Sequence, residues 1–278
     1  MLGYVVNDAL IKWAAEDLPL FQAIFLRGCA IVVLLLVLVR STGSAVPLGR
    51  YLSRPLVVRM SMEAAGTVAY LLALTKVPLA SLTAIIQLVP IAVTFIAARL
   101  LRESVSIVRI GAVLAGFVGV LFIIKPGSDD FSPWFIGGLV TVALIVVREL
   151  ATRHIPSDVP GVTVALGTGT VVTALALAIS AFDGWERPAG VRLGALAIAA
   201  VFLSLGYVGS INSIRRGDLS FTAPFRYSIL VFAIVMQILL FRDVPDGWTF
   251  FGAGIIAFAG LLAVSAERVP LPTRARPS

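Results

Sequence analysis

The 278-residue sequence has only one cysteine, one histidine and few charged residues. Cys29 has no partner for an internal disulfide, and Cys29 with His154 cannot supply the ligands of a structural zinc site. Charged residues make up 13% of the chain and hydrophobic residues 59%, whereas soluble proteins have about 25% charged residues. This composition cannot supply the polar surface that a soluble domain needs. The sequence therefore predicts a polytopic membrane protein.

The sequence also lacks the residue patterns that are typical of sites for nucleic acid, metals or cofactors. The formal net charge is +7, but the basic residues are not gathered on one exposed domain, so we expect no nucleic-acid partner. No HExxH or Gly-x-Ser-x-Gly motif occurs, and we expect neither a metal nor a cofactor.

Ten apolar segments are long enough, or nearly so, to cross a bilayer, which takes about 20 helical residues. The longest connection is 40–54, so the chain has no sizeable soluble domain. We expect an all-α integral membrane protein with ten transmembrane helices. These are Met1–Ala15, Pro19–Val39, Pro55–Leu74, Leu79–Leu100, Ile107–Ile124, Pro133–Thr152, Gly161–Phe182, Val191–Ser213, Leu219–Phe241 and Trp248–Ser265.

The first of these segments is short for a membrane span. A cleaved signal peptide would begin with a basic region, whereas this segment carries Asn7, Asp8 and Lys12 in its interior. We therefore expect a retained helix whose N-terminus is clipped. The matching helix of the second half has nine additional residues, 133–141, at its start.

The distribution of lysine and arginine predicts the orientation of the chain. If the N-terminus is cytoplasmic, fourteen of these residues lie in inside segments and five in outside segments. Cytoplasmic loops are enriched in positive charge. We expect a multi-pass protein of the inner or plasma membrane with both termini in the cytoplasm.

The two halves of the sequence resemble each other at a nearly constant offset. Segment 8–12, Asp-x-x-x-Lys, matches segment 149–153, Glu-x-x-x-Arg, at 141 residues, and Leu101–Glu103 matches Phe241–Asp243 at 140. We expect a first repeat in residues 1–126, a second in residues 133–266, and a disordered cytoplasmic tail in residues 267–278. Because each repeat has five helices, the second enters the membrane from the opposite side, an architecture typical of secondary transporters.

Several stretches resemble the drug/metabolite transporter superfamily, specifically its EamA family. The resemblance covers nearly the whole chain as two EamA-type units, and the best match runs from Asp218 to Leu262 and includes Ala223–Tyr227. One departure is Arg242-Asp243, where a Gly-Glu pair is more usual. The resemblance implies ten helices, a central cavity and alternating access for a small metabolite. It does not define the substrate.

Three ionisable residues lie deep within the expected spans: Arg27, Glu63 and Arg226. Each costs about 2.5–3.5 kcal/mol to insert and should face protein or water with a partner. A guanidinium suits a substrate carboxylate or phosphate. We therefore expect Arg27 and Arg226 to bind such a group, with Glu63 contacting a substrate amine or carrying a proton. The alternative is a structural ion pair, for example Arg27 with Glu63.

Other polar residues could complete a binding cavity. Asp8 is a second proton-coupling candidate, or it could pair with Lys12 one helical turn away. Arg148 lies near the cytoplasmic end of its span and could reach the cavity. The remaining substrate-binding candidates are Tyr70, Gln87, Tyr207 and Tyr227; the alternative for each is a hydrogen bond between helices.

The sequence predicts a membrane transporter and not an enzyme. We expect a permease that moves a small amino-acid-like, carboxylate-bearing or zwitterionic metabolite by alternating access, as a monomer or homodimer. We favour efflux as the direction of transport. The alternative is an uptake permease of the same fold. An intramembrane enzyme, which would have to use the loop residue His154, and a channel are the alternatives from other classes.

Overall fold

The computed structural model describes residues 1–100, 107–126, 131–216 and 219–265. Within these ranges, residues 94, 97–100, 109, 214–216, 219–227 and 263–265 are described by their backbone alone. The described part is helical and contains no β-strand. Its helices are α1 (Leu2–Ala14), α2 (Leu20–Ser41), α3 (Leu48–Tyr51), α4 (Arg54–Leu74), α5 (Leu79–Ile86), α6 (Leu88–Leu100), α7 (Ile107–Ile124), α8 (Phe135–Arg153), α9 (Gly161–Ser180), α10 (Gly190–Arg216), α11 (Leu219–Phe241) and α12 (Gly247–Ser265).

Proline marks the start of several helices. Pro19, Pro47, Pro78 and Pro160 are the N-cap residues of α2, α3, α5 and α9. The ring fixes φ near the helical value, and the missing N–H would have no helical partner at this position. The sequence therefore sets these boundaries locally.

The expected span Leu79–Leu100 is divided in two in the structure. Gln87 separates α5 from α6, and its N–H bonds Ala84 O at 3.1 Å in a tighter turn. Pro90 follows three residues later and has no N–H to give to the carbonyl of residue 86, so a regular helix cannot continue there. The other nine expected segments each contain one helix, and α3 is an additional short helix in the longest loop.

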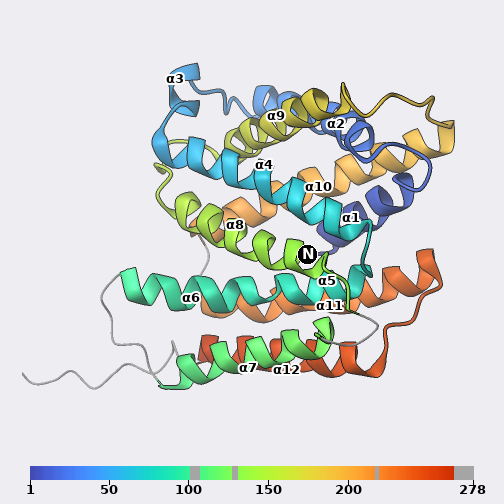
Figure 1. The fold of residues 1–278 in the computed structure, drawn as a ribbon. Helices are drawn as coiled ribbons and strands as arrows, with labels where there is room; N and C mark the ends of the chain where they lie inside the picture. The colour runs from blue at the N-terminus through green and yellow to red at the C-terminus, as the bar shows by residue number, and fades with distance from the viewer. Residues whose placement is uncertain (101–106, 127–130, 217–218, 266–278) are drawn as a thin grey trace, which may run out of the picture.

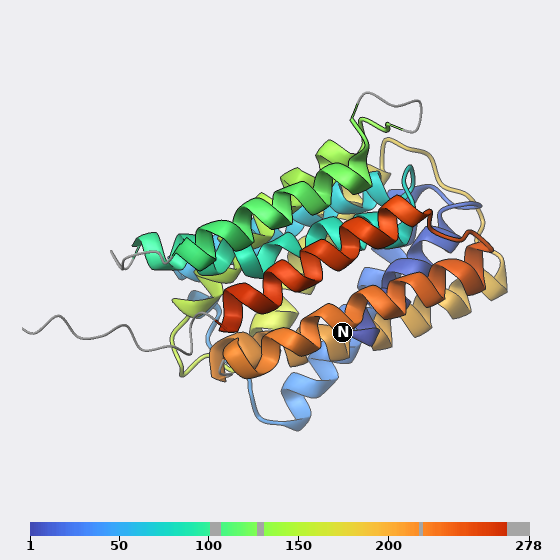
Figure 2. The ribbon, with the colours of Figure 1, turned by 90° about the horizontal axis from the view of Figure 1, so that it is seen from below.

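The helices lie roughly along one direction and stack in layers (Figure 1). α2 packs against α9 at one edge of the stack, and α7 packs against α12 at the opposite edge. Figure 2, viewed from the second edge, shows α7 and α12 beside each other. Between the edges, α4 packs on α8 and α1 on α10. Each of these four interfaces joins a helix of the first half to one of the second.

Two glycines bring α7 and α12 close together. A Cβ added to Gly119 would lie 2.7 Å from Gly252 O, and one added to Gly252 would collide with Gly119 O. Next to this contact, the ring of Phe122 stacks on Trp248 with centroids 5.6 Å apart. Small residues allow helices to approach in this way within lipid, where van der Waals packing holds them together.

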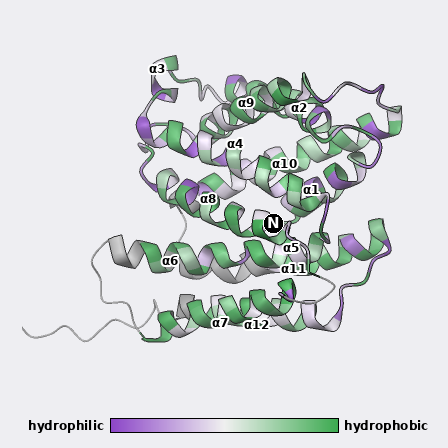
Figure 3. Ribbon diagram, in the orientation of Figure 1, coloured by the Kyte–Doolittle hydropathy of each residue, from purple (hydrophilic) through white to green (hydrophobic). Residues whose placement is uncertain are grey.

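Several helices have the length and composition of membrane spans. Within the described residues, five are long and apolar enough to cross a bilayer: α2, α4, α8, α9 and residues 190–213 of α10. Shorter apolar helices accompany them over Leu79–Val93, Ile110–Ile124, Ser228–Phe241 and Gly247–Leu262. Figure 3 shows hydrophobic residues over most of the helical surface, with much of the hydrophilic colour at helix ends and loops. The expected tail, residues 267–278, lies outside the described residues.

Candidate functional site

A cavity lies among helices from both halves of the chain. Its volume is about 160 Å³. The lining residues are Met1, Tyr4, Asn7, Asp8, Arg27, Met62, Glu63, Gly66, Thr67, Tyr70, Leu71, Thr83, Ile86, Gln87, Val89, Thr141, Ile145, Arg148, Leu203, Tyr207, Ser210 and Ile229. Four of them carry a carboxylate or a guanidinium group: Asp8, Arg27, Glu63 and Arg148. Burying such charged groups inside an apolar helix bundle is costly, so their presence marks a candidate functional site.

One wall of the cavity holds a closed ion pair. Arg148 Nη1 on α8 lies 2.7 Å from Glu63 Oε2 on α4, and the two side chains are 13% and 9% exposed. Arg148 Nη2 also lies 3.6 Å from Glu149 Oε1. Next to this pair, buried Arg59 donates to Thr152 Oγ1 at 2.6 Å. The guanidinium of Arg148 is therefore matched by carboxylates of its own protein.

A second group of charges on α1 and α2 is bridged by an amide. Arg27 Nη1 donates to Asn7 Oδ1 at 2.8 Å, and Asn7 Nδ2 donates to Asp8 Oδ1 at 2.9 Å. The hydroxyl of Tyr70 on α4 donates to the other oxygen of Asp8, also at 2.8 Å. Arg27 and Asp8 thus have opposite charges but bond to the two ends of one amide instead of to each other.

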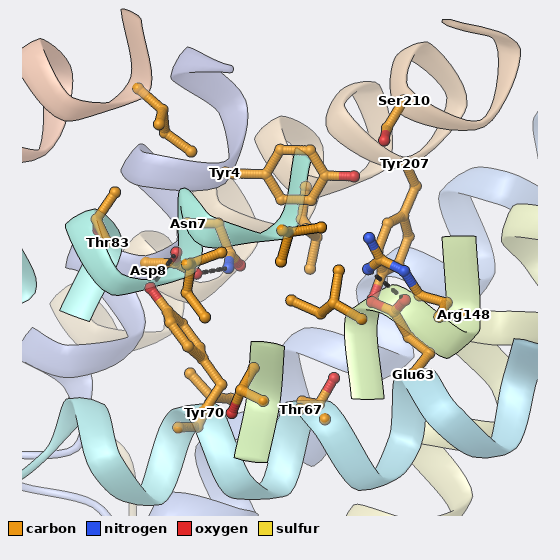
Figure 4. Close-up of a pocket in the computed structure, with 18 of the residues that line it drawn as sticks. Tyr4, Asn7, Asp8, Glu63, Thr67, Tyr70, Thr83, Arg148, Tyr207 and Ser210 are labelled. Atoms are coloured by element: carbon orange, nitrogen blue, oxygen red, sulfur yellow. Dashed lines mark hydrogen bonds and ion pairs between the residues drawn. The ribbon is translucent and has the colours of Figure 1, made fainter. Parts of the chain in front are cut away.

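The two groups face each other across the cavity. Figure 4 shows Asp8, Asn7 and Tyr70 on one side, and Glu63 with Arg148 on the other. Tyr207 lies beside the Glu63–Arg148 pair in the same view. The space between them is bounded by hydrophobic as well as polar side chains, so it suits a compound with both charged and apolar parts.

Seven of the nine candidates from the sequence line this one cavity: Asp8, Arg27, Glu63, Tyr70, Gln87, Arg148 and Tyr207. The other two, Arg226 and Tyr227, belong to α11, and their side chains lie outside the described part. Asp8 and Arg148 are distant in sequence but line the same cavity, on opposite sides. Whether any of these residues binds a substrate stays a prediction.

Two alternative pairings considered from the sequence are wrong. Glu63 pairs with Arg148 and not with Arg27, because α4 and α8 pack against each other and bring the two side chains together. Asp8 and Lys12 do not pair along α1, since Lys12 Nζ instead donates to Val77 O at 2.5 Å. Spacing along one helix therefore fails where a neighbouring helix offers a better partner.

Sequence reasoning did not select Asn7 or Arg59 as site residues. Asn7 is an uncharged amide, and only the three-dimensional contacts show that it bonds both Arg27 and Asp8. Arg59 stands close to the start of its expected span, but it lies within α4 and is 3% exposed. Its position one turn before Glu63 was the available signal. Among the described residues, no group of three His, Cys, Asp or Glu could hold a metal ion.

Polar contacts outside the cavity lining tie neighbouring helices together. The side chain of Gln22 forms two hydrogen bonds with the backbone of Glu186. Gln22 Nε2 donates to Glu186 O at 2.6 Å, and Glu186 N–H donates to Gln22 Oε1 at 3.0 Å. Arg192 on α10 donates to Asp17 Oδ2 at 2.7 Å and covers the Trp13 ring at 3.5 Å. These contacts bind the α1–α2 connection to the segment leading into α10.

No family model matches the chain, but curated relatives cover most of it. The pseudopaline exporter CntI of Pseudomonas aeruginosa is 27% identical over 272 residues, which is 95% of this chain and 93% of the exporter. The S-adenosylmethionine uptake transporter of Rickettsia felis is 24% identical over 264 residues, covering 94% and 88% of the two chains. This chain is similar to membrane transporters. The named functions include both export and uptake.

Two further comparisons agree on the fold and the class. A riboflavin transporter of Vibrio cholerae is 28% identical over 218 residues, which is 73% of this chain and 68% of that transporter. One solved crystal structure has a TM-score of 0.70 at 17% identity and covers 96% of this chain and 97% of its own. That likeness shows a shared fold. The named relatives are transporters and not enzymes, and they support a small-molecule substrate for this chain.

Proposed function

We propose that this protein is a secondary transporter that moves a small metabolite through the cavity by alternating access. The observation that carries the proposal is the cavity itself. Charged side chains from α1, α2, α4 and α8 line it, within helices whose outer surface is apolar. Charges in a membrane interior usually mark a substrate or ion pathway.

The proposal includes ten membrane spans in two inverted repeats of the EamA type, within the drug/metabolite transporter superfamily. The helix interfaces support such a repeat. If α1 corresponds to α8 and α4 to α10, the α1–α10 interface corresponds to the α8–α4 interface, and both are extensive. The α2–α9 and α7–α12 interfaces each join corresponding helices. Substrate sites of inverted-repeat transporters lie between the repeats.

The lysine and arginine distribution supports an inner or plasma membrane location with both termini in the cytoplasm. Under this topology, the contacts of Gln22 and Arg192 lie on the outer side. We propose that these contacts open when the substrate leaves on that side, as alternating access requires.

The charged lining supports a polar substrate that is carboxylate-bearing or zwitterionic. Efflux is the proposed direction, and uptake is the alternative that the S-adenosylmethionine uptake transporters favour. Asp8 and Glu63 are the proposed proton carriers. Asp8 has the simpler path, since Glu63 must first leave Arg148 to be protonated.

Comparative metabolomics of cells and medium tests the function. Cells would express the wild type, T67W or T170W at matched membrane levels, with an empty vector as reference. Thr67 lines the cavity, so tryptophan there should block it, whereas Thr170 is exposed on α9 and T170W is the matched control. We expect at least one compound to move only with wild type and T170W. Accumulation in the medium means export and depletion means uptake. Identical profiles in all four strains would contradict the proposal.

A further inference from the structure

Among the described residues, Arg27 lines the cavity without a direct salt bridge to any carboxylate. Arg27 is 2% exposed, and its described hydrogen bond goes to the neutral amide of Asn7. Its Nε has no partner, and it forms no salt bridge with a described carboxylate. A guanidinium offers five N–H donors and is costly to bury unless it is paired. Arg27 thus has donors left for an anionic group that enters the cavity.

Asp8 lines the same cavity and, among the described residues, has no direct salt bridge to a lysine or arginine. Asp8 accepts hydrogen bonds from Tyr70 and Asn7, but among the described residues no lysine or arginine forms a salt bridge with it. A carboxylate has about four acceptor positions. Asp8 can therefore accept hydrogen bonds from a cationic group as well.

Asn7 keeps these two charges apart. Its oxygen binds Arg27 and its nitrogen binds Asp8, so the two charged groups lie on either side of one amide. In the opposite wall, Glu63 and Arg148 touch directly and need no charge from a ligand. We call Arg27 and Asp8 the open pair, because their charges do not contact each other, and Glu63 and Arg148 the closed pair, because theirs do.

We infer that Arg27, Asn7 and Asp8 form a binding site for a zwitterionic substrate. The substrate carboxylate binds the guanidinium of Arg27, and the substrate ammonium binds Asp8, while Asn7 sets the spacing. A zwitterion satisfies both buried charges at once. An anion would leave Asp8 unmatched next to it, and a cation would do the same to Arg27. This inference rests on the proposed function and narrows its substrate class.

The experiment uses the full chain reconstituted in liposomes that are loaded with the small-molecule fraction of a bacterial cytosol. Mass spectrometry identifies the compounds that leave faster than from protein-free liposomes, and each is classed by its charged groups. We expect the compounds to carry both an ammonium and a carboxylate. R27Q and D8N should each lower their initial rates about tenfold or more, as expected for the loss of one charge-assisted contact, and R27K should recover part of the rate.

The matched controls are R153Q and D183N, at exposed positions outside the cavity, which should transport like the wild type. If the wild type moves only compounds that lack one of the two charged groups, the inference is wrong and the transporter proposal stands. The inference is also wrong if R27Q and D8N both keep the wild-type rate. If the wild type moves no compound, the proposed function fails and the inference fails with it.

Discussion

The two walls of the cavity use similar residues in different ways. At the 141-residue offset, Asn7 and Asp8 correspond to Arg148 and Glu149. In the second half, Arg148 forms a direct salt bridge with Glu63. In the first half, the corresponding position holds an amide that separates Arg27 from Asp8. We infer from this difference that a buried charge is not by itself a binding residue. In our proposal, a charge paired within the protein holds helices together, and a charge without such a partner binds a ligand.

The largest expected effect is on the closed pair. Glu63→Gln leaves the Arg148 guanidinium without its nearest carboxylate, and breaking a buried ion pair costs about 3–5 kcal/mol. We expect a corresponding fall in the unfolding free energy, measured by denaturant titration in lipid–detergent micelles. E186Q, at an exposed position, is the control and should be unchanged. A double variant, E63Q with R148M, should regain part of the loss; equal stability of E63Q and E186Q would contradict the assignment.

The next largest effect should come from the amide that keeps the open pair apart. Asn7→Ala removes two hydrogen bonds and lets Arg27 and Asp8 approach each other. We expect a loss of about 1–2 kcal/mol in unfolding free energy, smaller than that of E63Q, together with a loss of transport in proteoliposomes. If N7A lost more unfolding free energy than E63Q, the contacts of Asn7 would stabilise the protein more than the Glu63–Arg148 pair does, which contradicts this account.

A smaller effect should follow from removing one donor to Asp8. Tyr70→Phe deletes the hydroxyl that bonds Asp8 Oδ2 at 2.8 Å and should cost about 1 kcal/mol. Thermal unfolding of the purified protein measures it. The control is Y51F, since no described hydrogen bond involves the hydroxyl of Tyr51, and its melting temperature should match the wild type. A Y70F protein that melts with the control would show that this hydrogen bond adds nothing.

The smallest effect is expected for an ion pair outside the membrane spans. Asp246 lies in the α11–α12 connection, and its Oδ2 is 2.6 Å from Lys125 Nζ. The side chain of Asp246 is 42% exposed. Partial burial raises its pKa, but hydrogen bonds from Lys125 and Thr249 outweigh this and bring the pKa to about 2. Such exposed pairs contribute less than about 1 kcal/mol.

The pH dependence of this pair follows from the lowered pKa. Its stabilisation is complete above the ordinary aspartate pKa of about 3.9 and is lost as the pH falls toward about 2. The melting temperature of D246N should therefore be slightly below that of the wild type at pH 7 and equal to it below about pH 2. A difference that grows on acidification would be inconsistent with this account.

The sequence predicts the positions of the helices better than it predicts which helices and side chains contact each other. Apolar length and proline positions, such as Pro78 before α5, act within a short stretch of chain and are readable there. The division at Gln87 depends on backbone hydrogen bonds around Pro90 and shortens an expected continuous span.

Polarity selected seven residues that line the described cavity, because buried polar residues are rare in a membrane helix. The pairing of Glu63 with Arg148 could not be predicted in this way, since it depends on which helices pack together. The role of Asn7 depends on two hydrogen bonds that no spacing pattern encodes.

The central claim, that solute crosses the membrane through this cavity, can be tested by blocking it chemically. Cys29 is the only cysteine, so C29S gives a background free of thiols into which T67C is introduced. Solute efflux from proteoliposomes is measured before and after labelling with a membrane-permeant maleimide, and T170C on the same background is the control. The account predicts that labelling stops efflux through T67C and leaves T170C unchanged. Fully labelled T67C that transports at its unlabelled rate would contradict it.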